Sequence, residues 1–351
     1  MDKLNVGILG ATGMVGQRFI EGLVDHPYFE IKALAASERS EGKRYKDAAK
    51  WYLSGEIPAD IASAEVVDMS ESIVEKYDLD IIFSAIPAEI AEKVEGSFAK
   101  KIPLFSNTKT YRMEDDVPLI IPEVNPEHLS LLEVQKKRRK WEGFIITNPN
   151  CSTVGLVVPL KPIMDKYGLK WVNVATMQAL SGAGYNGVPS MAILDNMIPF
   201  IGGEEPKVET ETLKILGKFG NSKVDYAKFA VFASCNRIAT LNGHMEAAFI
   251  GTEKDCSEDD IKKALSGFKG EPQKLKLPSA PNPVIIVREE DDRPQPRLDR
   301  DAGKGMAVTC GRIRKKMENV FKFTCLSHNT IRGAAGASIL NAELVYKKGL
   351  I

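Results

Sequence analysis

The first forty residues alternate between short apolar runs and a segment with helical periodicity. Residues 4–9 are apolar and are followed by glycine, which predicts a buried strand. Phe19, Ile20 and Leu23 then recur at helical spacing, and a second apolar run covers residues 31–36. A strand, a helix and a strand in this order predict a β-α-β unit with parallel strands.

The same pattern continues up to Cys151 and then changes. Residues 80–87 and 103–107 are predicted strands, and both end in small polar residues, where parallel sheets bind ligands. Beyond Cys151, strand-like segments follow with few helices between them, which predicts an α+β domain on a largely antiparallel sheet. We therefore expect an α/β fold with one domain over residues 1–150 and a second over residues 151–328. The predicted strands of the second domain are residues 171–180, 229–233, 237–240, 245–250 and 284–287.

The turn after the first strand is rich in glycine, with the sequence Gly10-Ala11-Thr12-Gly13-Met14-Val15-Gly16. Glycines here permit a tight turn and let the backbone approach a pyrophosphate that faces the N-terminus of the next helix. The spacing is G-x-x-G-x-x-G rather than G-x-G-x-x-G, and the alternative is a turn with no ligand. Its place between a strand and a helix favours a Rossmann-type domain, with Gly10, Thr12, Gly13, Met14 and Val15 as cofactor-binding residues.

The second strand ends in the polar turn Ser37-Glu38-Arg39-Ser40. NAD-binding proteins usually place an acidic residue here for the adenosine ribose. Arg39, with the hydroxyls of Ser37 and Ser40, suits a 2′-phosphate if Glu38 points away. This turn favours NADP over NAD, and the alternative is an ordinary polar turn.

Cys151 lies in Asn148-Pro149-Asn150-Cys151-Ser152-Thr153, between the apolar run 144–146 and the apolar residues that follow. This predicts a thiol at a strand-to-helix turn. Backbone N–H groups and the helix dipole stabilise a thiolate there and can hold an oxyanion on an attacked carbonyl. The alternative is a buried structural cysteine.

Two further polar clusters are candidate sites. Arg237 and His244 flank a glycine-containing turn, so that one could hold a carboxylate and the other could transfer protons. Gln178 opens a glycine-rich segment and could orient a carbonyl, whereas Glu204 and Lys207 stand at a predicted helix start. The alternatives are a structural histidine, a flexible connector and a charged first turn.

Composition excludes several classes of protein. Lysine plus arginine and aspartate plus glutamate number 47 each, which argues against nucleic-acid binding. The basic run 136–140 is interpreted as the solvated face of a helix. Five widely spaced cysteines argue against a disulfide framework and a metal site and favour a cytoplasmic location. We expect neither secretion nor a membrane span.

Taken together, these motifs resemble the aspartate-β-semialdehyde dehydrogenase family, in its archaeal and fungal branch. The matching motifs occur in family order over nearly the whole chain. The resemblance implies a homodimer or homotetramer, and it returns residues 329–351 to the first domain as a helix. The motifs are G-x-x-G-x-x-G, N-P-N-C-S-T, Q-x-L-S-G-A-G, G-G-E-E-x-K, R-x6-H and H-N-T-I-R-G-A-A-G-A.

The resemblance also implies a role for each matching residue. Cys151 would be the nucleophile and His244 the acid/base. Asn107-Thr108-Lys109 departs from the smaller residues that the family has at this place. The implied substrate-binding residues are Gln178 for orientation, Arg237 for the α-carboxylate, Glu204 (or Glu205) for the amino group, and Arg112 and Lys207 for phosphate. Those near the cofactor are Ser181, Gly182, Asn329, Gly333 and Gly336.

The implied reaction is the reversible, NADPH-dependent reduction of aspartyl phosphate to aspartate semialdehyde through a cysteine thioester, in the biosynthesis of aspartate-family amino acids. An alternative is a malonyl-CoA reductase of the same fold, which would need no phosphate site. A reading from another class is a nicotinamide-binding sensor that carries out no chemistry and would not need Cys151.

Overall fold

The structure, a computed structural model, describes residues 3–351. The chain divides into two compact units. The first contains the residues up to Ile120, His128–Asn148 and Ala334–Ile351, and the second contains Ile121–Glu127 and Pro149–Gly333. Each unit is described by itself.

The first unit is built on a six-stranded sheet in the order β3-β2-β1-β4-β5-β6, and every pairing is parallel. The order reverses between β1 and β4, which creates the crevice where doubly wound sheets bind nucleotides. This confirms the predicted Rossmann-type domain. The strands are β1 (Leu4–Leu9), β2 (Phe29–Ala35), β3 (Val66–Val67), β4 (Ile81–Ser84), β5 (Leu104–Ser106) and β6 (Ile145–Thr147).

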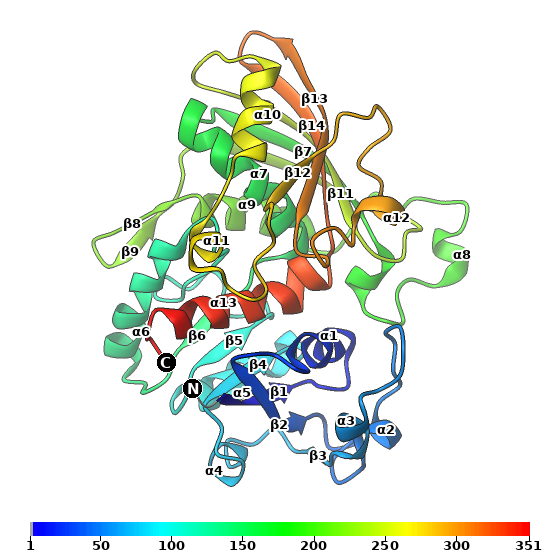
Figure 1. The fold of residues 1–351 in the computed structure, drawn as a ribbon, viewed down its shortest axis with the longest axis vertical. Helices are drawn as coiled ribbons and strands as arrows, with labels where there is room; N and C mark the ends of the chain where they lie inside the picture. Colours follow the sequence, from blue (N-terminus) through cyan, green and yellow to red (C-terminus); the bar gives the residue numbers. More distant parts are fainter. Residues whose placement is uncertain (1–2) are drawn as a thin grey trace. The chain divides into compact units, whose positions relative to one another are not determined.

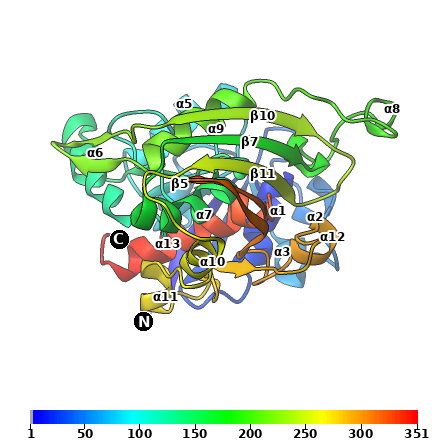
Figure 2. The same cartoon turned by 90° about the horizontal axis from the view of Figure 1, so that it is seen from above.

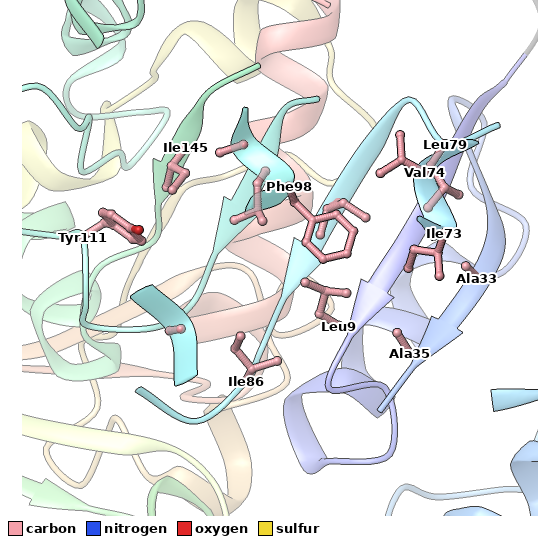
Figure 3. Close-up of a cluster of buried hydrophobic side chains, with 14 of the residues drawn as sticks. Leu9, Ala33, Ala35, Ile73, Val74, Leu79, Ile86, Phe98, Tyr111 and Ile145 are labelled. Carbon is pink, nitrogen blue, oxygen red and sulfur yellow. The ribbon is translucent and has the colours of Figure 1, made fainter. Parts of the chain in front are cut away.

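Apolar residues of these strands pack against the neighbouring helices, as Figure 3 shows for a cluster around Leu9, Phe98 and Ile145. Strands of a parallel sheet are covered on both faces, which explains why most of their residues are apolar, although Glu30 and Lys32 of β2 are exposed. The longer helices of this unit are α1 (Met14–Leu23), α5 (Ala88–Ala99), α6 (Leu131–Arg139) and α13 (Gly336–Lys347), and the short ones are α2 (Tyr45–Ala48), α3 (Ala59–Ser63) and α4 (Ile73–Lys76).

Helix α13, drawn in red in Figure 1, belongs to the first unit although it lies at the end of the chain. It packs against α1 and β5. A buried pair of side chains also ties it to the turn after α1, with 2.9 Å between Nε2 of His26 and Oε1 of Glu343. The Tyr28 backbone N–H donates to His26 Nδ1, so the neutral ring carries its proton on Nε2 and donates it to the carboxylate.

The second unit holds a mixed six-stranded sheet in the order β10-β7-β11-β14-β13-β12. The three central pairings are antiparallel, whereas the outer pairs β10/β7 and β13/β12 are parallel. Figure 2 shows β10, β7 and β11 side by side. The strands are β7 (Trp171–Gln178), β10 (Ala230–Arg237), β11 (His244–Gly251), β12 (Ile285–Val287), β13 (Val308–Met317) and β14 (Val320–Ser327), with a separate hairpin of β8 (Lys218–Gly220) and β9 (Lys223–Asp225).

Two details of the predicted second sheet were wrong. Residues 229–233 and 237–240 do not form separate strands, because β10 runs without a break to Arg237 and pairs there with Gln178. The chain then leaves the ladder at Ile238, whose N–H donates to the Gln178 carbonyl. Strands β13 and β14 were missed, because lysine and arginine alternate with their buried positions and mask the apolar run.

One face of this sheet is covered by α7 (Cys151–Tyr167), which packs on β11, β13 and β14. The opposite face carries outward-pointing side chains of β10, β7 and β11 at alternating positions. Phe232 and Phe249 are 58% and 43% exposed on it. The remaining helices are α8 (Ser190–Ile193), at the end of a projecting segment in Figures 1 and 2, α9 (Glu204–Ile215), α10 (Glu258–Ser266), α11 (Glu271–Leu275) and α12 (Pro296–Asp299).

Candidate active site

Cys151 is the first residue of α7, as the turn sequence predicted. Asn150 caps the helix: its Oδ1 accepts hydrogen bonds from the backbone N–H groups of Ser152 at 2.9 Å and Thr153 at 3.2 Å. The thiol therefore lies at the positive end of a seventeen-residue helix. This position favours the thiolate form that a nucleophile needs.

The cap is itself held by two glutamates of α9. Glu204 Oε1 accepts from Asn150 Nδ2 at 2.7 Å, and Glu211 Oε2 accepts from the Asn150 backbone N–H at 2.6 Å. Because one amide edge donates to Glu204, the Oδ1 edge has to face the helix. The two carboxylates thus fix the residue that precedes the candidate nucleophile.

His244 is a polar partner of the thiol, with 3.2 Å between its Nε2 and Cys151 Sγ. The backbone N–H of Ala179 donates to His244 Nδ1 at 3.0 Å, so a neutral ring carries its proton on Nε2 and directs it at the sulfur. Burial lowers the His244 pKa to about 3, and the charges of Arg237 and His328 lower it further. The ring is therefore a neutral hydrogen-bond donor at physiological pH.

Two glycines allow this close packing. A Cβ at Gly333 would lie 2.6 Å from the Cys151 Cβ, and a Cβ at Gly182 would lie 2.8 Å from Nη1 of Arg237 and 3.2 Å from Cε1 of His244. Real side chains do not come so close. The loop after β7 and the segment before α13 therefore approach the thiol as bare backbone.

Gln178 and Arg237 end the parallel strands β7 and β10 and lie opposite each other in the ladder. Arg237 Nη1 donates to the Ala179 carbonyl at 2.6 Å, while Gln178 Nε2 donates to the Thr176 hydroxyl at 3.2 Å. Burial lowers the pKa of Arg237, and the charges of Cys151 and Glu204 act in the opposite direction. A partly buried guanidinium beside the thiol suits a carboxylate ligand.

The first turn of α9 contains Glu204, Glu205 and Lys207, and the two glutamates have different partners. Glu204 is buried and pairs with Lys207, with 3.0 Å between Oε2 and Nζ. Glu205 points to the edge strand instead, where its Oε1 accepts from the Cys235 backbone N–H at 3.1 Å. Glu209 does the same for Ala233 at 3.0 Å. These two carboxylates cap backbone donors of β10 that would otherwise remain unpaired at a sheet edge.

Asn329 and Ser181 lie on the same side of the site. The Asn329 amide donates to Ser181 Oγ at 2.8 Å, and its carbonyl oxygen accepts from the Gly243 N–H at 2.8 Å. Gly243 precedes His244 in the chain. Asn329 thus connects three loops that carry predicted site residues.

The glycine-rich turn of the first unit has the geometry of a phosphate-binding loop. Gly10 has a φ of +78°, and a Cβ there would lie 2.6 Å from the Ala85 carbonyl oxygen. A Cβ at Gly16 would lie 2.2 Å from the Gly10 carbonyl oxygen. Gly13 starts α1 without a side-chain cap, so the helix N-terminus is open to an anion. The buried side chain of Gln17 stabilises the turn, because its Nε2 donates to the Thr12 carbonyl at 3.2 Å.

The polar turn after β2 is accessible. Ser37, Glu38 and Arg39 are exposed, and Ser40 is half-buried. Lys43 Nζ donates to the Arg39 carbonyl at 2.6 Å, which adds a second cation to the turn. The sequence analysis did not single out Lys43, because it lies beyond the four-residue turn.

Arg112 belongs to the first unit and is 7% exposed. Its Nη2 donates to the Asn107 carbonyl at 3.0 Å, which folds the segment after β5 onto the guanidinium. Thr108, part of the departure noted in the sequence, is buried, and its hydroxyl donates to the buried carboxyl group of Glu95 at 3.2 Å.

All five cysteines are free thiols, and only Cys151 is not fully buried. Burial raises the pKa of Cys235 to about 12 and of Cys256 to about 11, and raises those of Cys310 and Cys325 as well. Within residues 3–351, no group of three or more His, Cys, Asp or Glu side chains is arranged to hold a metal ion. No helix of the described chain is long and apolar enough to cross a membrane.

Sequence reasoning missed the residues that support the site. Glu211, Glu246 and Glu95 are buried carboxyl groups in segments without a recognisable motif. Glu246 follows His244 by two positions on β11, its carboxyl group lies 3.7 Å from Cys325 Sγ, and burial raises its pKa well above the ordinary value. The available signal was an acidic residue at a helix position whose spacing predicts burial. Acidic residues are rarely buried without a partner, so such a position indicates a supporting contact.

Comparison with known proteins places this architecture among the semialdehyde dehydrogenases. The family models for the NAD binding domain and the dimerisation domain of semialdehyde dehydrogenases match residues 5–132 and 160–332. A relative from Methanothermobacter thermautotrophicus, an aspartate-semialdehyde dehydrogenase, is 57% identical over 97% of this chain and 99% of its own length. The chain belongs to the aspartate-semialdehyde dehydrogenase family.

Structural similarity agrees with this assignment. The crystal structure of aspartate-semialdehyde dehydrogenase with NADP from Candida albicans has a TM-score of 0.91 and 42% identity, and covers 100% of both chains. A malonyl CoA reductase (NADP) from Metallosphaera sedula is 41% identical over 99% of this chain and 98% of its own length. The resemblance seen in the motifs to the archaeal and fungal branch is thus confirmed, and the chain is an oxidoreductase.

Proposed function

We propose that this chain is an NADP-dependent aspartate-semialdehyde dehydrogenase that interconverts aspartyl phosphate and aspartate semialdehyde through a thioester on Cys151. The observation that carries this proposal is the 3.2 Å contact between Cys151 Sγ and His244 Nε2 at the start of α7. The archaeal relative at 57% identity supports the choice of substrate. The malonyl CoA reductase relative, at 41%, is less similar.

In the oxidative direction, the Cys151 thiolate attacks the aldehyde carbon and forms a C–S bond. The carbonyl oxygen becomes negative and accepts a hydrogen bond from Nε2–H of His244, the residue for which the resemblance implies an acid/base role. NADP, when bound, supplies the acceptor for the hydride that leaves this carbon. A phosphate oxygen then attacks the thioester, the C–S bond breaks, and Cys151 leaves as a thiolate stabilised by α7.

Two residues at the ends of neighbouring strands bind the substrate in this proposal. Arg237 holds the α-carboxylate, since its guanidinium lies in electrostatic reach of Cys151. Gln178 orients the substrate through its amide. Lys207 and Arg112 are the phosphate-binding cations.

We assign the substrate amino group to Glu204 rather than Glu205. Glu204 Oε1 and Oε2 face Asn150 and Lys207 at the start of the nucleophile helix, whereas Glu205 caps the Cys235 N–H of the edge strand. A substrate ammonium bound to Glu204 would therefore lie next to the residue that precedes Cys151. An ammonium bound to Glu205 would instead compete with the hydrogen bond that Glu205 makes to β10.

The first unit is the proposed NADP-binding domain and the second the catalytic and oligomerisation domain. The cradle formed by Gly10, Gly13 and Gly16 fits a pyrophosphate, because side chains at Gly10 and Gly16 would collide with the backbone. Thr12, Met14 and Val15 complete this loop. Arg39, with Ser37, Ser40 and the additional cation Lys43, supports a 2′-phosphate. Ser181, Gly182, Asn329, Gly333 and Gly336 are the proposed nicotinamide-side residues.

We propose a homodimer or homotetramer formed through the uncovered face of the second sheet. Phe232 and Phe249 stand exposed around a centre of small residues, in which Ala175 pairs with Ala247 in the ladder. An apolar surface of this kind on an enzyme is usually covered by another chain. The matched dimerisation domain, residues 160–332, contains this face. The five free thiols support a cytoplasmic location.

The deciding experiment follows NADPH formation from aspartate semialdehyde and NADP, with and without phosphate, for the wild type and Cys151→Ala. We expect phosphate-dependent turnover that is lost in the variant. Turnover with malonyl-CoA and NADPH, without activity towards aspartate semialdehyde, would instead support the reductase, and binding of NADP without any turnover would support the sensor.

A further inference from the structure

The carboxyl group of Glu95, on α5, lies buried beneath the ends of strands β4 and β5 in the first unit. Its exposed fraction is 0%. Ser106 Oγ lies 2.9 Å from its Oε1 and 3.0 Å from its Oε2, and Thr108 Oγ1 lies 3.2 Å from Oε2. The Thr108 backbone N–H in turn donates to Ser106 Oγ at 3.0 Å. One carboxyl group therefore organises the last residue of β5, Ser106, and the two residues that follow it.

The same three residues hold Arg112. The middle residue, Asn107, accepts from Arg112 Nη2 through its carbonyl at 3.0 Å and donates through its N–H to the Ser84 carbonyl at 3.0 Å. A change at Glu95 can therefore reach the guanidinium through its hydrogen bonds to Ser106 and Thr108 and through the backbone of Asn107 between them. The contact between Thr108 and Glu95 also explains why Asn107-Thr108-Lys109 departs from the family pattern. The Thr108 hydroxyl donates to the buried carboxyl group and not to an external anion.

Few charged groups face Glu95, and Arg112 is a cation whose charge favours the ionised form of this carboxyl group. Burial raises the Glu95 pKa to about 7. The hydroxyl groups of Ser84, Ser106 and Thr108 oppose that rise, and the charge of Arg112 adds a smaller effect in the same direction. Strands β4 and β5 contain no titratable side chain. The other titratable groups near it are Tyr111, whose hydroxyl donates to the Glu92 carbonyl, Glu92 itself, Arg139 against the Tyr111 ring and the exposed Lys109.

We propose that Glu95 is a positioning residue for Arg112 and that it takes up a proton when a phosphate or acyl phosphate binds to this arginine. An ionised carboxyl group at Glu95 offsets part of the positive charge of Arg112 through their electrostatic interaction, whereas a neutral one leaves that charge to the ligand. A bound dianion in turn disfavours the ionised carboxyl group. Protonation of Glu95 and anion binding at Arg112 therefore favour each other by the same free energy. This inference rests on the phosphate role proposed for Arg112.

The test uses sulfate as the probe, because its charge does not change between pH 6 and pH 8. We expect the inhibition constant for sulfate against phosphate to rise about fivefold from pH 6 to pH 8 in the wild type. In Glu95→Gln, which keeps a neutral side chain of the same shape, the constant should stay level. Thr108→Val removes one hydroxyl and keeps the carboxyl group, so its pH dependence should persist with a shifted midpoint.

A level constant in the wild type, or the same slope in Glu95→Gln, would overturn the proposal. A merely structural role would change kcat and the KM for aspartate semialdehyde at every pH, whereas the coupling acts on the KM for phosphate and only above neutral pH. Sulfate binding measured by calorimetry in two buffers of different ionisation enthalpy gives the proton uptake of the wild type directly, without any variant. If turnover proves independent of phosphate, the proposed function fails, and the calorimetric result still decides the coupling.

Discussion

Ala179 donates its backbone N–H to Nδ1 of His244 at 3.0 Å, and this contact decides which ring nitrogen carries the proton. Nδ1 has to present a lone pair, so the proton of the neutral ring is on Nε2 and faces Cys151. An imidazolium would place a second proton against the Ala179 N–H. The histidine is therefore built to donate a hydrogen bond to the sulfur and to an oxyanion formed beside it.

Replacing His244 tests this donor role. We expect His244→Ala to lower kcat by about 10²- to 10³-fold, the usual loss when an oxyanion donor is removed. His244→Gln retains an N–H donor and should keep more activity than the alanine variant. Steady-state kinetics of both variants decide the matter, and equal loss in the two would contradict a donor role.

The pH dependence of the stability of the folded chain follows in part from the lowered His244 pKa. Because its pKa is about 3 in the folded chain, the ring stays neutral while the unfolded chain binds a proton near pH 6.5. Its contribution to stability is therefore fully present above pH 6.5 and is lost as the pH falls towards 3. Denaturant unfolding between pH 7 and pH 4.5 should show a smaller loss of stability in His244→Gln than in the wild type. A profile of kcat/KM with a histidine ionisation near pH 6.5 that vanishes in this variant would count against a neutral ring.

Cys151 should be the one cysteine that reacts rapidly with iodoacetamide at neutral pH. Burial raises the pKa of Cys235 to about 12 and of Cys256 to about 11, and the four cysteines other than Cys151 are all buried. Mass spectrometry of the native protein should find one label, on Cys151, and none in Cys151→Ser. Rapid labelling of a second cysteine would show that accessibility does not separate them.

Gly333→Ala should inactivate the enzyme without unfolding it, because the new methyl group would lie 2.6 Å from the Cys151 Cβ. We expect a loss of kcat of at least about tenfold and slower thiol labelling, with a cost in stability of about 1 to 3 kcal/mol. The matched control is Gly220→Ala, where nothing lies within 4 Å of the added Cβ. Activity equal to that of the control would mean that the segment moves aside freely.

Substitutions of the two neighbouring glutamates of α9, Glu204 and Glu205, should have different effects on kinetics and on stability. Glu204→Gln should raise the KM for aspartate semialdehyde by about tenfold, because a charge-assisted contact to the substrate is worth roughly 1.5 to 3 kcal/mol. Glu205→Gln should leave KM nearly unchanged and lower the melting temperature slightly, because it weakens the cap on the Cys235 N–H. The reverse pattern in kinetics and thermal unfolding would transfer the substrate role to Glu205.

The uncovered sheet face can be tested by its effect on assembly. Phe249→Asp places a charge on this face and should shift the protein to a smaller species in size-exclusion chromatography with light scattering. Leu298→Asp alters a residue of α12 that is 57% exposed and away from the sheet, so it should leave the assembly intact. An unchanged oligomer in Phe249→Asp would place the interface elsewhere.

The first unit was readable from the sequence because its signals are local. Apolar runs such as residues 4–9 are buried on both faces, and the glycine-rich turn has to precede a helix. The second sheet was harder, since its strands are half-exposed. Lys322 and Thr324 alternate with buried positions on β14, and Arg237 extends β10 where a new strand was expected.

The sequence by itself determined the fold class, the family and the position of Cys151 at a helix start, because motif order and turn chemistry lie in the chain. Only the tertiary structure decided which glutamate faces Asn150, which nitrogen of His244 holds the proton and which carbonyl group accepts from Arg112. These depend on contacts between residues far apart in the chain, such as Asn150 with Glu211 and Cys151 with His244. Periodicity and spacing carry no information on such contacts, since they are made by packing after the elements have formed.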